Sequence, residues 1–236
     1  MVDNNVNTFA DMFTLGLLAI ALYNSPHDSP LKVHGSLSGY RRLFGSSSTI
    51  PSASNNFLCG KTLPRDLAQH VLPRLLTRRP AGRMTAKEFQ DSEYFNNIFV
   101  STIRFLDTFP AKAPNEKAQF MRGLNKVLPQ FPKSVMEKKV LPALLDELKD
   151  KELLPLVLHN VFKIVDLLPA GAAVFGELIR PMIKKIFVVP AKPGQDKDVH
   201  RDAGLMVFLE YLALIARSCS GKDFKDGELI STRSLI

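Results

Sequence analysis

The chain has 236 residues, of which 45% are hydrophobic, and its 31 basic and 23 acidic residues give a net charge of +8. That hydrophobic share supports real cores and excludes a globally disordered chain, while the moderate, spread positive charge favours solvated helix faces over a nucleic-acid partner. The two cysteines, Cys59 and Cys219, lie far apart in no metal-like spacing, so we expect a reduced cytoplasmic compartment.

The first predicted element is a helix over residues 8–24, TFADMFTLGLLAIALYN. Its apolar run, Met12–Leu22, has eleven residues, against about 20 for a membrane-spanning helix, and no positive leader of a signal peptide precedes it. Thr8 and Asp11 fit a capping box before a helix that is apolar on nearly all sides, which is typical of the middle of a protein. We therefore expect a fragment whose helix has lost part of its cover, with exposed apolar surface around residues 8–24 and 67–76.

The next part of the chain is polar and then returns to helical spacing. Residues 25–56 are rich in Ser, Pro and Gly and predict exposed loops, with one short helix near residues 37–44. Residues 64–76 carry apolar side chains at helical spacing, and Thr85 with Glu88 fits a capping box before a short amphipathic helix. Because no stretch alternates as a strand does, we predict an all-α chain.

From Asn96 onward, helical segments alternate with joints that contain a proline: Pro129, Pro142, Pro155, Pro169 and Pro181. The Leu-Pro pair at 128–129 recurs 40 residues later at 168–169, and Pro142 recurs 39 residues later as Pro181. A period near 40 residues with two helices in each unit is the signature of HEAT or armadillo repeats. The end of the chain, residues 219–236, predicts a repeat that is cut off in its second helix. The predicted helices are 115–128, 133–148, 152–167, 171–188 and 202–218.

Two stretches resemble the C-terminal lobe of a protein kinase. The segment ADMFTLGLL resembles the long buried helix of that lobe, whose Asp-x-Trp-Ser-x-Gly motif is matched by Asp11, Thr14 and Gly16. The segment LPRLLTRRPAGRMTAKEFQDSEYF resembles the end of the kinase domain, with matches at Leu75, Leu76, Pro80, Arg83, Thr85, Phe89 and Phe95. A kinase-like lobe that runs into Pro-punctuated helical repeats resembles the Scy-like pseudokinase family, here with its N-terminal part missing.

The resemblance implies an all-α fold with two domains. Residues 1–97 are expected to be the C-terminal part of a kinase-like domain, and residues 98–236 HEAT-like repeats of which the last is incomplete. It also implies a non-catalytic scaffold or adaptor in vesicle trafficking, related to clathrin or other coats. The expected partners are vesicle coat or adaptor proteins, with peripheral contact to anionic membranes of the Golgi or endosomes and no nucleic acid.

Whether the chain contains the catalytic motifs of a kinase decides whether we expect kinase activity. A kinase needs a Gly-rich loop, a strand lysine, a His-Arg-Asp loop with its Asn, and an Asp-Phe-Gly magnesium site. We find none of these complete motifs, so we expect no enzyme activity, no nucleotide or other cofactor, and no metal. The alternative is that the chain is the C-terminal fragment of an active kinase whose catalytic parts lie upstream of Met1.

Of the matched residues, Asp11, Gly16 and Arg83 are expected to have structural roles in the kinase-like fold. In kinases the aspartate binds the catalytic-loop backbone, but here we expect a carboxylate that only favours the start of a helix. The kinase arginine pairs with an upstream glutamate that this chain lacks. We therefore expect Arg83 to be solvated or to pair with Glu88 or Asp91.

A set of lysines is the candidate partner-binding surface. Lys133, Lys138 and Lys139 belong to the second predicted helix of one repeat, and Lys184 and Lys185 end the second helix of the next. If equivalent helices lie side by side, these lysines form one continuous positive rim suited to an acidic adaptor segment or an anionic membrane. The alternative is a solvated face, with the last two lysines complementing a helix C-terminus.

Overall fold

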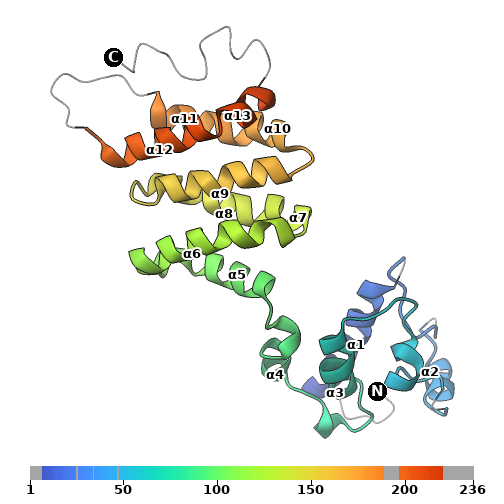
Figure 1. The fold of residues 1–236 in the computed structure, drawn as a ribbon. Helices are drawn as coiled ribbons and strands as arrows, with labels where there is room; N and C mark the ends of the chain where they lie inside the picture. The colour runs from blue at the N-terminus through green and yellow to red at the C-terminus, as the bar shows by residue number, and fades with distance from the viewer. Residues whose placement is uncertain (1–6, 25, 34, 47, 189–196, 220–236) are drawn as a thin grey trace. The chain divides into compact units, whose positions relative to one another are not determined.

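In the computed structural model, the residues that are described are 7–24, 26–33, 35–46, 48–188 and 197–219 (Figure 1). Every regular element within them is a helix, which confirms the all-α prediction, and no helix among them is long and apolar enough to cross a membrane. The chain forms two compact units, Met1–Ser101 and Thr102–Ile236, and the boundary lies inside helix α5 (Ile98–Asp107). The domain boundary after residue 97 stays a prediction.

Unit 1 contains short helices around α1. The predicted first helix, the short helix near residue 40 and the helix around residue 70 are all confirmed. The helices are α1 (Thr8–Tyr23), α2 (Leu37–Leu43), η1 (Ala53–Leu58), η2 (Leu67–Val71), α3 (Leu72–Leu75), η3 (Pro80–Gly82), α4 (Ala86–Gln90) and η4 (Glu93–Phe95).

The two predicted capping boxes have different outcomes. At α1 the predicted box is wrong, because the N-cap is Asn7, whose side-chain oxygen accepts a hydrogen bond from Phe9 N at 3.1 Å. Asn7 has the extended backbone of an N-cap, so Thr8 is already the first helical residue. At α4 the predicted box is confirmed, since Glu88 Oε2 accepts from Thr85 N at 2.7 Å and Thr85 Oγ1 accepts from Glu88 N at 3.2 Å.

Helix α1 packs on the segment 72–76 through one narrow stripe. Met12, Gly16 and Ile20 are buried, and a Cβ atom on Gly16 would lie 2.8 Å from Leu76 Cδ2. The glycine therefore allows an approach that a larger side chain would prevent. The opposite side of α1 is open: Leu18 is 54% exposed, which agrees with the expected apolar surface.

The expectation of exposed apolar surface around residues 67–76 is wrong. Leu67, Val71, Leu72 and Leu75 are all essentially inaccessible to solvent. They form the centre of the unit 1 core with Phe57, Leu63 and Met84, because α1, η1 and η4 all pack against this short helical segment. An apolar face at helical spacing is thus covered by short elements that the sequence pattern does not reveal.

Unit 2 is a stack of helix pairs, and the predicted spans from 115 to 188 are confirmed to within two residues. The predicted last helix is confirmed as two helices, α12 and α13, that meet at Tyr211, while residues 220–236 of the predicted incomplete repeat lie outside the described residues. After α5 the elements are η5 (Phe109–Ala111), α6 (Pro114–Val127), η6 (Leu128–Gln130), α7 (Lys133–Val135), η7 (Met136–Val140), α8 (Leu141–Asp146), η8 (Glu147–Lys149), α9 (Leu154–Leu167), α10 (Gly171–Val174), η9 (Phe175–Ile179), α11 (Arg180–Phe187), α12 (Val199–Glu210) and α13 (Leu212–Ser218).

The helices of unit 2 fall into two parallel sets. The first helices of the pairs are α6, α9 and the pair α12–α13, and α9 lies between the other two (Figure 1). The second helices are the continuous segments 133–146 and 171–187, which run in the same direction as each other (Figure 1). First helices that lie side by side therefore belong to successive repeats of the sequence.

Two of the predicted Pro joints are not joints. Pro142 and Pro181 lie inside continuous second helices, and in both cases a π turn, η7 or η9, ends two residues before the proline. Leu141 N bonds Met136 O and Arg180 N bonds Phe175 O, five residues back. Widening the helix relieves the clash between the proline ring and the carbonyl four residues earlier.

The same arrangement occurs in unit 1. The π turn η2 ends two residues before Pro73, and Leu72 N bonds Leu67 O. The other three joints are confirmed as helix boundaries: Pro129 lies in η6, Pro155 lies in the first turn of α9, and Pro169 lies in the turn that follows α9. In a first turn a proline costs no hydrogen bond, because the backbone N–H there has no helical acceptor.

A close approach between two helices of the stack supplies a test of the packing. A Cβ atom on Gly204 of α12 would lie 2.9 Å from Leu154 Cδ2 and 3.2 Å from Phe187 Cζ, whereas one on Gly123 of α6 would meet no atom within 4 Å. We expect Gly204→Leu to lower the free energy of unfolding of unit 2 by about 1–3 kcal/mol through overpacking. Gly123→Leu, the matched control, should raise it slightly through helix propensity. Thermal and urea unfolding of both variants measures this, and equal stabilities would contradict the packing.

Candidate functional site

The kinase-like residues of unit 1 surround the start of α1. Asp11 lies exposed in the first turn of this helix, and the described part of the chain shows no hydrogen-bond partner for its carboxylate. Its negative charge there suits the positive end of the helix dipole. The role of Asp11 at the start of this helix stays a prediction.

Arg83 is held by backbone carbonyl groups. Its Nη1 atom donates to Phe9 O at 2.7 Å, its Nε atom donates to Thr77 O at 3.0 Å, and its guanidinium carbon lies 4.8 Å from the centre of the Phe13 ring. Burial lowers the pKa of this guanidinium below its usual range, although the group stays charged at neutral pH. Arg83 therefore ties the loop after η3 to the first turns of α1.

The expected carboxylate partners of Arg83 are wrong. Glu88 instead accepts from Arg74 Nη2 at 2.5 Å, and Asp91 pairs with Lys87 at 3.0 Å. The Thr85 backbone N–H, followed by Arg74, lowers the pKa of Glu88 to about 2. Because the capping box already holds the Glu88 carboxylate, Arg83 donates its hydrogen bonds to the backbone carbonyl groups of Phe9 and Thr77 instead.

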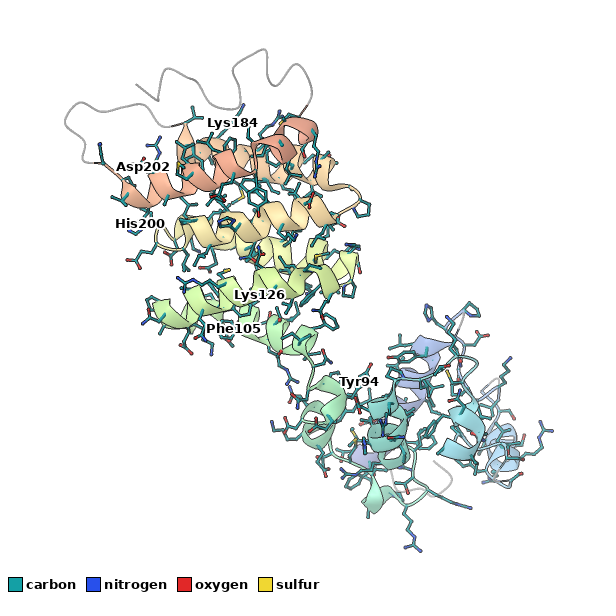
Figure 2. All side chains as sticks on the ribbon, viewed as in Figure 1. Tyr94, Phe105, Lys126, Lys184, His200 and Asp202 are labelled. Atoms are coloured by element: carbon teal, nitrogen blue, oxygen red, sulfur yellow. The ribbon has the colours of Figure 1, made fainter. Side chains whose placement is uncertain are left out.

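Sequence reasoning misses one kinase-like tripeptide, His200-Arg201-Asp202. It lies in the first turns of α12, where the Asp198 side chain accepts from Arg201 N at 3.2 Å and Arg201 Nη2 donates to Phe187 O at 2.6 Å (Figure 2 labels His200 and Asp202). A kinase catalytic loop has an Asn five residues after its Asp, but here that position is Val207, which is buried in the stack. The tripeptide is therefore part of a helix start and not a catalytic loop.

The candidate lysines lie at two different places. Lys133, Lys138 and Lys139 are exposed in the first half of the segment 133–146. Lys184 is half-buried and Lys185 is exposed, both in the last turn of α11 (Lys184 is labelled in Figure 2).

These positions do not form the expected rim. Because the two second helices are parallel, the first set lies toward the start of one helix and the second set lies at the end of the other (Figure 1). The continuous positive rim is therefore wrong. The cluster that remains is Lys133, Lys138 and Lys139, and we call it the lysine cluster.

Buried polar groups in unit 2 also escape sequence reasoning. Asn160 of α9 is 1% exposed, and its Nδ2 atom donates to Met121 O of α6 at 2.9 Å and to Leu156 O at 2.8 Å. Lys117 Nζ lies 3.6 Å from Glu147 Oε2 and 5.0 Å from the centre of the Phe109 ring. Because these groups join neighbouring helices, they have a structural role.

Metal chemistry gains no support from the described residues. Among them, no three His, Cys, Asp or Glu side chains gather in a way that could hold a metal ion. Cys59 is buried and Cys219 is partly buried, and neither forms a disulfide. The exposed lysine cluster is the candidate site that these residues leave for a charged partner.

Comparisons with known proteins find relatives of one kind. The chain is 33% identical over 155 residues to protein kinase domain-containing protein ppk32 of Schizosaccharomyces pombe, covering 66% of this chain and 20% of that protein. It is 25% identical over 222 residues to SCY1-like protein 2 of Homo sapiens, covering 94% of this chain and 22% of the relative. It is 28% identical over 102 residues to the protein named probable inactive serine/threonine-protein kinase scy1 of Dictyostelium discoideum, covering 43% of this chain and 12% of the relative.

The extent of these matches bounds what they imply. The chain spans about a fifth of the length of the first two relatives and less of the third. The human match covers nearly all of this chain, so both units take part in it. No model of a known protein family matches the chain, and no solved structure matches it.

The contacts of Arg83 lead to a prediction about unit 1. We expect Arg83→Met to lower the free energy of unfolding by about 1–3 kcal/mol, because the Phe9 and Thr77 carbonyl groups lose a charged donor. Arg78→Met is the matched control, since Arg78 is exposed and lies five residues before Arg83 in the chain. Urea unfolding followed by helical circular dichroism compares the two variants. Equal stability of both variants would show that the Arg83 hydrogen bonds contribute nothing.

Proposed function

Because this chain belongs to the Scy1-like family of protein kinase-like proteins, we propose that it works as a non-catalytic scaffold whose helical stack binds a protein partner. The observation that carries the proposal is the stack of unit 2, in which equivalent helices of successive repeats lie side by side (Figure 1). Surfaces built from successive helices are the usual recognition faces of such solenoids. The kinase-like residues of unit 1 support this view, since Gly16 and Arg83 serve packing.

The chemistry of phosphoryl transfer supports the absence of activity. That reaction depends on a phosphate cradle, a catalytic base and metal ligands, which together supply nearly all of the catalysis. The 236 residues contain no Gly-rich phosphate loop and no Asp-Phe-Gly, and their one His-Arg-Asp tripeptide begins a helix. The name of the Dictyostelium relative describes that protein as a probable inactive kinase.

The partner class follows from charge. The lysine cluster presents three exposed ammonium groups within seven residues of a rigid helix, with Glu137 as the one acidic residue between them. An acidic segment of a coat or adaptor protein is the partner of matching charge, since complementary potentials speed association and select partners. A role in vesicle traffic, in the cytoplasm and peripherally at Golgi or endosomal membranes, completes the proposal.

Charge reversal tests the lysine cluster. We expect the variant Lys133→Glu, Lys138→Glu, Lys139→Glu to keep its helicity and to bind coat and adaptor proteins roughly tenfold more weakly at low salt, with a smaller loss at high salt. The matched control is Lys32→Glu, Lys61→Glu, Arg79→Glu, which changes the net charge equally at exposed positions of unit 1. Pull-down from cytosol measures the effect. Parent-like binding by the cluster variant would remove this surface from the proposal, and a loss confined to acidic liposomes would point to a membrane.

Nucleotide binding tests the non-catalytic part separately. We expect calorimetry to detect no magnesium-dependent binding of ATP by this chain in the micromolar range, because the residues that hold the phosphates and the metal are absent. Titration with ATP alone and with ATP plus magnesium separates specific binding from attraction of an anion to a basic chain. Micromolar affinity that requires magnesium would contradict the proposal.

A further inference from the structure

The π turn before Pro142 leaves two backbone acceptors without their regular donors. In a regular α-helix the carbonyl oxygens of Glu137 and Lys138 would accept from the N–H groups four residues later. In η7, which lies between α7 and α8 (Figure 1), Leu141 N donates to Met136 O instead, and Pro142 has no N–H to donate. These two neighbouring carbonyl groups therefore lack the hydrogen bond that a regular helix would supply.

The two acceptors lie on the exposed side of the helix. Glu137, Lys138 and Pro142 are exposed. Met136 and Val140, on the other side, are fully buried. Carbonyl groups on the solvent side of a helix tilt outward, so these two can accept hydrogen bonds from donors outside the helix. Departures of this kind from the regular helix occur frequently at functional sites.

Positive charges surround these acceptors. In the lysine cluster, Lys138 and Lys139 belong to the π turn itself, and Lys133 lies at the start of the same helix. One short surface therefore offers cations and hydrogen-bond acceptors together. An ionised carboxylate or phosphate can pair with the lysines, but it has no proton to donate to the carbonyl groups. A ligand that satisfies both must carry anionic groups and separate hydrogen-bond donors.

We propose that η7 is a docking site for an extended acidic peptide segment. Its carboxylates pair with the lysine cluster, and its backbone N–H groups donate to the carbonyl groups of Glu137 and Lys138. A helical partner uses its N–H groups internally beyond its first turn, whereas an extended segment has them available. The docking site rests on the proposed function, because it is the same surface, and it adds a need for donors to the need for charge.

A second π turn in the stack has the acceptors without the cations. In η9, Arg180 N bonds Phe175 O, and Pro181 again supplies no donor. With the 39-residue offset between the two prolines, the equivalents of the lysine cluster are Ala172, Glu177 and Leu178. We therefore expect an acidic segment to bind at η7 and not at η9, and Pro181 offers a matched control.

Restoring a backbone donor tests the acceptors without changing any charge. Pro142→Ala adds an N–H that can bond the carbonyl group four or five residues back, so either Lys138 or Glu137 loses an open acceptor. Alanine also favours a helix, so the stack should stay folded. By fluorescence anisotropy at low salt, we expect Pro142→Ala to bind a labelled decaglutamate peptide about three- to tenfold more weakly than the parent chain does. Pro181→Ala should bind it as the parent does.

The peptide itself supplies an independent test. An analogue of decaglutamate with an ester oxygen in place of each backbone N–H keeps the carboxylates and loses the donors. We expect the parent chain to bind this analogue about three- to tenfold more weakly than decaglutamate, and Pro142→Ala to lose little more.

The outcomes separate the docking site from the proposed function. If decaglutamate binds the parent but binds Pro142→Ala equally well, or if the ester analogue binds the parent equally well, the role of the carbonyl groups is overturned and charge pairing by the lysine cluster stands. If the parent does not bind decaglutamate at all, both are overturned. Tighter binding to phosphatidylserine vesicles that Pro142→Ala does not weaken would overturn the peptide site in favour of a membrane.

Discussion

The contact of α9 with both α6 and α12 is the constraint on which unit 2 depends. On one side Asn160, which is buried, donates to Met121 O of α6, and on the other side Gly204 of α12 lies against Leu154. Apolar contacts alone would tolerate sliding of parallel helices, but the buried Nδ2 group of Asn160 meets a carbonyl oxygen of α6 in few registers, and a buried donor left unpaired costs about 1–3 kcal/mol. The hydrogen bond therefore fixes the stack, and the second helices follow from it.

The prolines of the stack show how a repeat can include residues that break helices. Pro142 and Pro181 occupy equivalent places, and both are preceded by a π turn that makes room for the proline ring. The extra residue in the turn also rotates the residues before the proline relative to those after it. Met136 and Val140 on one side and Leu144 on the other thus remain buried in one continuous helix.

Unit 1 shows kinase-like residues with structural roles. Gly16 allows α1 to approach Leu76, and Arg83 binds the Phe9 and Thr77 carbonyl groups, so both act on the position of α1. Neither role needs a nucleotide or a metal. Because these residues hold the fold without a ligand, they fit the proposed non-catalytic scaffold.

The sequence by itself determined the helices and their pairing, because helical spacing and the 39- to 40-residue recurrence are local properties of the chain. It also indicated the Thr85–Glu88 capping box, which depends only on neighbouring residues. Only the tertiary structure decided what lies opposite each face: the carbonyl partners of Arg83, the buried amide of Asn160, and the separation of the lysine cluster from Lys185. These depend on helix direction and on contacts between residues far apart in sequence, which spacing along one helix does not encode.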